Sequence, residues 1–128
     1  MKAKRRLVLG TLENTPSQAI GTLLVQSLLD KSERRPFSVH RVRMKPGASH
    51  PPLFHARMSE LFLVLDGSMR AKIDGRPRRF VKGGFAYLPP GAIHEFHAGR
   101  NGVEVLAVFS PPMNLNKPDI VFQSSRKP

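Results

Sequence analysis

The sequence contains no cysteine, no tryptophan and only 1 tyrosine. Without cysteine the chain can form neither a disulfide framework nor a thiolate metal site, so nitrogen and oxygen atoms must hold any metal ion. No apolar run is longer than the five residues Leu61 to Leu65, which is too short for a membrane-spanning helix. The basic start at residues 2–6 is followed by only three apolar residues, too few for a signal-peptide core. We therefore expect a cytoplasmic protein.

Acidic residues are also scarce. The chain has 9 Asp and Glu against 21 Lys and Arg, which gives a formal net charge of +12. Such an excess attracts anions, and nucleic acid is one partner to consider. The basic residues gather at 2–6, 31–35, 76–79 and 126–127. No helix-turn-helix, zinc-finger or aromatic stacking pattern accompanies these runs, so a solvated charged face is the simpler interpretation.

Prolines and glycines are frequent, with 12 and 10 respectively, and they separate segments of strand length. This punctuation predicts an all-β fold. In the segment 37–44, His40, Val42 and Met44 share one face by period two. The segment 17–30 fits a helix and a strand equally well. Further strands are predicted at 60–65, 68–73, 78–81, 85–88, 93–97, 103–109 and 120–122, with turns at Asp66–Gly67, Asp74–Gly75, Gly83–Gly84, 89–91 and 100–102.

The strand at 60–65 is apolar on both faces. Glu60, Phe62 and Val64 share one face, and Leu61, Leu63 and Leu65 share the other. A two-sided apolar strand is typical of a strand that is buried on both sides. One face can line a barrel, and the other then needs a second layer or a partner subunit. For a chain this short we expect a homodimer.

Two stretches resemble the two motifs of the cupins. In the first motif a glycine, a His-x-His pair, a glutamate and a second glycine follow one another, and Gly47, His55, Glu60 and Gly67 keep this order. The second motif matches residues 83–94, of which His94 is the histidine. The resemblance implies a jelly-roll barrel, also called a double-stranded β-helix. It divides the chain into a basic arm at 1–16, a barrel domain at 17–122 and a tail at 123–128.

The same resemblance implies a metal site that lacks one ligand. Similar cupins hold a divalent ion through two histidines and the glutamate of the first motif and the histidine of the second. Leu53 stands where the first histidine is expected, which leaves His55, Glu60 and His94. Two imidazoles and a carboxylate suit iron, manganese, nickel or zinc. The alternative is a degenerate cupin with an empty pocket.

Four other side chains are candidates for the pocket. His50 could replace the missing ligand, but two prolines follow it and its strand parity differs from that of His55, so a surface position is expected. His40 is either a polar group of the pocket wall or a hydrogen-bonded core histidine. Arg57 could hold a substrate carboxylate, although a surface ion pair is the commoner role. Tyr87 is a further candidate substrate contact that also suits packing.

Two classes of function fit these observations best. The first is a metal-dependent enzyme, such as an oxygenase or an isomerase, acting on a small anionic or oxygen-rich molecule. The second is a binding module of the same fold that holds a small ligand without chemistry. A nucleic-acid-binding protein acting through basic loops comes third. Fold resemblance does not assign a reaction, so the sequence leaves the first two open.

Overall fold

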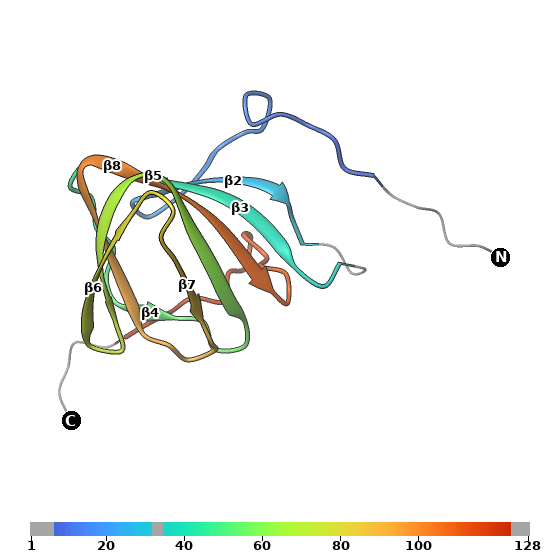
Figure 1. Cartoon of the computed structure of the whole chain (residues 1–128). Helices are drawn as coiled ribbons and strands as arrows, with labels where there is room; N and C mark the ends of the chain where they lie inside the picture. Colours follow the sequence, from blue (N-terminus) through green and yellow to red (C-terminus); the bar gives the residue numbers. More distant parts are fainter. Residues whose placement is uncertain (1–6, 32–34, 124–128) are drawn as a thin grey trace.

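The computed structural model describes residues 7–31 and 35–123, and within these ranges the chain is built from strands and turns (Figure 1). The strands are β1 (Gln18–Ile20), β2 (Leu23–Leu29), β3 (Ser38–Met44), β4 (Leu53–Phe54), β5 (Ser59–Ile73), β6 (Arg76–Val81), β7 (Phe85–Leu88), β8 (His94–Ser110) and β9 (Val121–Phe122). The all-β prediction is confirmed. The segment 17–30 is a β-hairpin, in which β1 pairs antiparallel with β2, and β2 pairs in turn with β3. None of the described residues lies in a helix capable of crossing a membrane.

The strands form one antiparallel sheet that curls into a barrel (Figure 1). Its order is β1-β2-β3-β8-β4-β9, and β5 joins it by pairing with β8 on one side and with β6 and β7 on the other. The longest ladder joins β5 to β8, from Ser59 opposite Ser110 to Ile73 opposite His94. β8 is therefore shared by the two halves of the barrel.

Two predicted turns are wrong. Asp66–Gly67 lies inside β5 and residues 100–102 lie inside β8, so each long strand continues through the predicted turn. The β5–β8 register shifts around Asp66 and again after Gly67, and the φ angle of Gly67 is 74°. Such bulges bend a strand without ending it, which the curl of the barrel requires. Asp74–Gly75 is a hairpin turn as predicted, with positive φ at both residues.

The barrel interior holds the core. The alternating residues Phe62, Val64, Met69 and Ala71 of β5 face inward, where they pack with buried residues of β8 such as Val105. The opposite face of this part of the sheet is open in the single chain. Leu61, Phe85 and Tyr87 are 43%, 68% and 62% exposed. The prediction that both faces of 60–65 are covered therefore depends on a partner.

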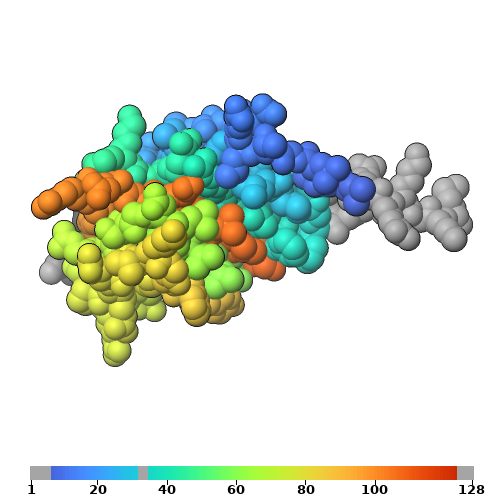
Figure 2. Space-filling view, turned by 45° about the horizontal axis from the view of Figure 1, so that its top comes forward, coloured from blue at the N-terminus to red at the C-terminus, as the bar shows by residue number. Residues whose placement is uncertain are grey.

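The basic runs are only partly visible. The runs at 2–6 and 126–127, and residues 32–34 of the run at 31–35, lie outside the described residues. The run at 76–79 opens β6, and its side chains are exposed, in the yellow part of the surface in Figure 2. The predicted domain boundaries stay predictions.

We predict that Gly67→Ala destabilises the barrel more than Gly83→Ala does. Both glycines have positive φ, so either alanine costs about 1 kcal/mol of backbone strain. Only at Gly67 does the added Cβ meet other atoms, because it would lie 2.1 Å from the carbonyl oxygen of Gly102. Such overpacking costs roughly 1–3 kcal/mol more. Thermal unfolding of the two variants should show a clearly lower Tm for Gly67→Ala, and equal losses would contradict the steric argument.

Candidate metal centre

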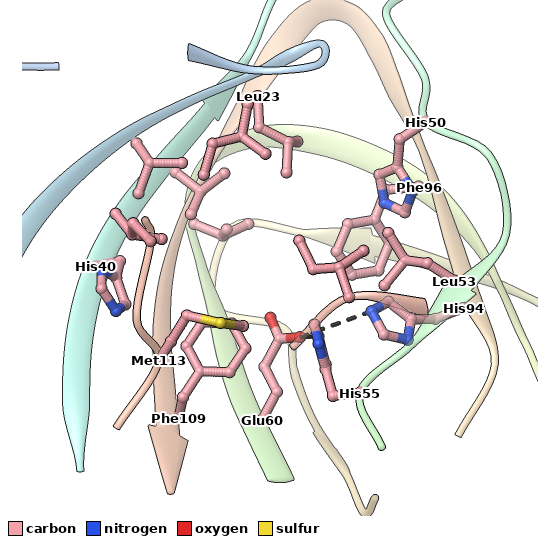
Figure 3. A pocket seen from close by; sticks show the side chains of 16 residues that line it. Leu23, His40, His50, Leu53, His55, Glu60, His94, Phe96, Phe109 and Met113 are labelled. Atoms are coloured by element: carbon pink, nitrogen blue, oxygen red, sulfur yellow. Dashed lines mark hydrogen bonds and ion pairs between the residues drawn. The ribbon is translucent and has the colours of Figure 1, made fainter. Parts of the chain in front are cut away.

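Three buried side chains meet inside the barrel, and each comes from a different element (Figure 3). His55 lies in the loop between β4 and β5, Glu60 near the start of β5, and His94 at the start of β8. Each side chain offers one nitrogen or oxygen atom, and these atoms all lie within 4.8 Å of one another. The sequence motifs predicted this same trio, and the fold brings its members together.

The imidazole rings are oriented by backbone carbonyl groups. Nδ1–H of His55 donates to the carbonyl oxygen of Asp119 at 2.7 Å, and Nδ1–H of His94 donates to that of Ala92 at 2.9 Å. In the neutral ring the other nitrogen, Nε2, then carries a lone pair. The two Nε2 atoms lie 3.2 Å (His55) and 3.7 Å (His94) from Oε1 of Glu60. Three hydrogen-bond acceptors, the two Nε2 atoms and the carboxylate oxygen, therefore lie close together, and neutral histidine rings provide no hydrogen-bond donor between them.

The donor set therefore fits a cation. Backbone carbonyls that fix the Nδ1 tautomer and leave Nε2 free are the usual outer partners of metal-bound histidines. Without a metal, a proton between a histidine and the carboxylate relieves part of the conflict. Burial lowers the pKa of His55, but the hydrogen bond to Glu60 and its negative charge outweigh burial, so this pKa lies above its ordinary value. Burial dominates at His94 and holds its pKa below the ordinary value despite the charge of Glu60.

Asp119 is a positioning residue that sequence reasoning missed. Its carbonyl oxygen holds the ring of His55, and its carboxylate accepts the backbone N–H groups of Ala56 at 3.0 Å and Arg57 at 2.8 Å. Desolvation raises the pKa of this carboxyl, but the N–H donors lower it more, so the pKa lies below its usual range. No motif marks Asp119, because its role depends on the tail returning to the 55–57 loop.

The prediction that His50 lies on the surface is wrong. His50 is 8% exposed and its Nδ1–H donates to the carbonyl oxygen of Pro51 at 2.8 Å. Its ring packs edge-on against Phe96, with centroids 5.1 Å apart. The backbone N–H of His50 donates to the carbonyl oxygen of Phe96, and this bond ties the loop to β8. His50 therefore lines the same cavity, although it is not one of the three convergent residues.

His40 is a hydrogen-bonded core histidine that also touches the cavity. It is 1% exposed, and its Nδ1 and Nε2 atoms each lie 2.9 Å from a serine hydroxyl, of Ser27 and Ser38 respectively. Both ring nitrogens are therefore occupied, which leaves none for a substrate. In Figure 3 the ring lies across the cavity from His94.

The other two candidate substrate contacts lie elsewhere. Arg57 shares the loop of His55 but is exposed, and Tyr87 lies on the outer face of the barrel; neither lines the cavity. His97 pairs with Glu95 at 3.1 Å and is not one of the three convergent residues. The structure thus brings together the three predicted ligands and His40, but not Arg57 or Tyr87.

Comparison with known proteins decides the family. A profile of the cupin domain matches residues 40–109, more than half of the chain. The chain is a cupin. The predicted jelly-roll fold is confirmed by its solved relatives: ectoine synthase from P. lautus is similar with a TM-score of 0.77 at 17% identity, over 95% of this cupin and 94% of that chain.

The proteins that are similar in sequence are matched over only part of their length. An uncharacterized protein of Aquifex aeolicus is 32% identical over 63 residues, 49% of this cupin and 52% of that protein. Oxalate oxidase GF-3.8 of Triticum aestivum is 30% identical over 94 residues, 66% of this cupin and 40% of that protein. The cupin thus spans about half or less of the length of these two relatives. Its fold also resembles oxalate decarboxylase from Bacillus subtilis, with a TM-score of 0.74 at 20% identity over 94% of this cupin and 33% of that chain.

Leu53 occupies the missing ligand position. It is buried, pairs with His94 across β4 and β8, and lines the cavity. An apolar side chain therefore stands beside the trio where a fourth ligand would stand in similar cupins.

We predict that His40 makes folding pH-dependent. Burial lowers the pKa of His40 to about 4, against which the charges of Glu60 and Asp30 act only weakly. As the pH falls from about 6.5 to about 4, the unfolded chain gains a proton that folded His40 does not take up, so the free energy of unfolding decreases. The loss approaches roughly 1.4 kcal/mol per pH unit, or about 3 kcal/mol in total.

Urea unfolding between pH 4 and pH 7.5 tests this effect. His40→Gln should be less stable than the parent at neutral pH, because two buried hydrogen bonds are disturbed, but its stability should fall less steeply toward pH 4. His97→Gln, which removes a partly exposed imidazole, is the control. Parallel profiles for the parent and His40→Gln would refute the assignment.

Proposed function

We propose that this cupin binds a divalent metal ion through His55, Glu60 and His94 and that it acts on or binds a small molecule there. The observation that supports this most directly is the convergence of two imidazole lone pairs and a carboxylate, all buried. A buried carboxylate without a compensating charge is costly, and a divalent cation compensates it while using all three donors. Iron, manganese, nickel and zinc all accept this ligand set.

The chain's own residues would support such a site in three ways. The carbonyl groups of Asp119 and Ala92 hold the two rings, so Nε2 of each keeps its direction. Glu60 provides a carboxylate oxygen beside both rings. The apolar walls around the trio exclude water, which strengthens electrostatic interactions within the cavity. A bound divalent ion would supply Lewis acidity and open positions for an oxygen donor.

Enzyme and binding module are both consistent with these features. Two similar proteins are named for oxalate chemistry, the wheat oxalate oxidase and the Bacillus oxalate decarboxylase. Their names favour an enzyme over a passive module, without distinguishing the oxygenase or isomerase that the sequence suggested from other metal-dependent enzymes. The three protein ligands, with Leu53 in place of a fourth, favour an ion with more than one exchangeable position, which is what a substrate needs.

We also propose that the cupin forms a homodimer through the outer face of β5 and β7. Leu61 pairs with Tyr87 and Leu63 with Phe85, which gathers exposed apolar side chains on one surface. Water contact with such a surface is unfavourable, and a second copy offers the same apolar face in return.

We predict that alanine at any one of the three ligand positions weakens metal binding at least tenfold. Losing one of three protein donors leaves a poor chelate. Titration of the metal-free protein with manganese, iron(II), nickel and zinc measures the effect, and His97→Ala should bind as the parent does. Leu53→His should bind more tightly, because position 53 is buried beside His94. Undiminished binding by Glu60→Ala would refute the site.

We predict that Phe85→Glu and Tyr87→Glu shift the protein toward monomers. A glutamate on each copy would place unpaired charges within the apolar interface. Light scattering at micromolar concentration should show a dimer for the parent and smaller particles for both variants. Phe122→Glu, which changes an exposed phenylalanine of β9, is the matched control and should stay dimeric. A parent protein found only at 14.3 kDa would refute the dimer.

A further inference from the structure

The cavity around the trio has an almost wholly apolar wall. Sixteen residues line it, and eleven of them are aliphatic residues, phenylalanines or a methionine. The other five are Glu60 and four histidines. No lysine, arginine, serine, threonine, asparagine or glutamine is among the lining residues. The excess of basic residues in this chain is thus absent from its cavity.

The two histidines outside the trio offer nothing to an anion. Both ring nitrogens of His40 are occupied by Ser27 and Ser38. Nδ1–H of His50 donates to the carbonyl oxygen of Pro51, so Nε2 of the neutral ring is an acceptor. An acceptor repels a carboxylate oxygen. Among the residues that line the cavity, none offers a positive charge to a ligand oxygen atom. A negatively charged oxygen of the ligand is therefore stabilised only at the proposed metal position beside Glu60.

The apolar wall has a definite place relative to the trio. Val105 of β8 and Val25 of β2 lie on the barrel wall, while Met113 and Ile120 come from the segment after β8. Figure 3 shows Met113 and Phe109 beside Glu60, and Leu23 at the far end of the cavity. A molecule with one end at the trio thus has its remaining atoms against hydrocarbon.

We infer that the ligand of this site is a small, mainly apolar molecule with a single oxygen-donor group, such as a short monocarboxylate, and not a dianion. This inference rests on the proposed function, because the donor group is placed at the metal position. A second carboxylate that does not reach the metal position would lie against apolar side chains without a donor, which is strongly unfavourable.

The size of the cavity limits the length of the apolar part of the ligand. The volume of the cavity is about 70 Å³. A protein cavity of about 150 Å³ lined by similar side chains accommodates benzene, so half that volume, which must also hold the oxygen-donor group, limits the ligand to a short carbon chain. Butanoate is therefore the longest probe in the test.

The net charge of +12 acts in the opposite direction, because it attracts a dianion more than a monoanion. This attraction acts over a distance and is screened within about 8 Å at an ionic strength of 0.15 M. Desolvation of a second carboxylate inside the cavity is not screened by salt. At physiological ionic strength the apolar wall should therefore decide the preference.

The test compares carboxylates of matched length on the cobalt(II)-loaded full chain at pH 7.5 and 0.15 M ionic strength, with the visible cobalt spectrum as readout. Acetate, propanoate and butanoate form one series, and succinate, whose second carboxylate is remote from the first, is the dianion. Each added methylene should tighten binding about fourfold. Succinate, which is butanoate with a carboxylate in place of its methyl group, should bind at least a hundredfold more weakly. Succinate binding as tightly as butanoate would overturn the inference.

Two valines of β8 provide a matched pair of variants. Val105 faces the cavity, whereas Val108 faces outward. Val105→Thr should reduce the preference for butanoate over acetate, because it adds a hydroxyl group to the wall. Val108→Thr should leave the preference unchanged. An unchanged preference in Val105→Thr would also overturn the inference.

An experiment on the metal-free protein distinguishes a failure of the proposed metal site from a failure of the inference about the apolar wall. If cobalt(II) does not bind, the proposed metal function fails, and the apolar wall is then tested alone with uncharged probes. Butan-1-ol should shift the methyl NMR signals of Val25, Val105 and Met113 in the metal-free protein, and ethylene glycol should not. Equal effects of the two alcohols would overturn the inference about the wall.

Discussion

The antiparallel ladder between β5 and β8 is the interaction on which the site depends. Glu60 lies at one end of this ladder, opposite Phe109, and His94 lies at the other end, opposite Ile73. In a straight strand, Glu60 and Ile73 would be about 43 Å apart, since each residue adds about 3.3 Å. In the barrel, Nε2 of His94 and Oε1 of Glu60 are separated by 3.7 Å. The curl of one ladder thus turns its two ends into neighbours.

The bulges and Gly67 allow the β5–β8 ladder to bend as the barrel requires. The register shifts around Asp66 and Gly67 bend the ladder where it passes from one half of the barrel to the other. At this bend the backbone of Gly67 lies so close to that of Gly102 that a Cβ atom would not fit. A glycine that does not line the cavity therefore contributes to the geometry of the trio.

The residues around the trio fix the orientation of the two histidine rings, and most of the side chains that line the cavity are apolar. Two backbone carbonyls fix the histidine rings, and one of them belongs to Asp119 in the segment after β8. The same segment supplies Met113 to the apolar wall. The C-terminal part of the chain thus contributes to both the ligand geometry and the ligand environment. No lysine or arginine is among the residues that line the cavity, so the positive charge of the chain acts on the approach of anions and not within the cavity.

The sequence by itself determined the local features and the identity of the three convergent residues. A period-two pattern predicted β3, the turn residues on both sides of 85–88 predicted β7, and Asp74–Gly75 predicted the hairpin turn at the end of β5. Two motifs in register with the cupins predicted His55, Glu60 and His94. These features could be predicted because each depends on neighbours in the chain or on a fixed spacing.

Only the tertiary structure decided the remaining features. Asp66–Gly67 has the composition of a turn, yet β8 supplies hydrogen-bond partners on both sides of it, so the strand continues as a bulge. His50 is buried because its loop is tied to β8, and Asp119 reaches His55 because the tail returns to the barrel. The apolar wall is likewise assembled from strands and a tail far apart in sequence. Contacts of this kind depend on how distant segments pack, and no local pattern encodes them.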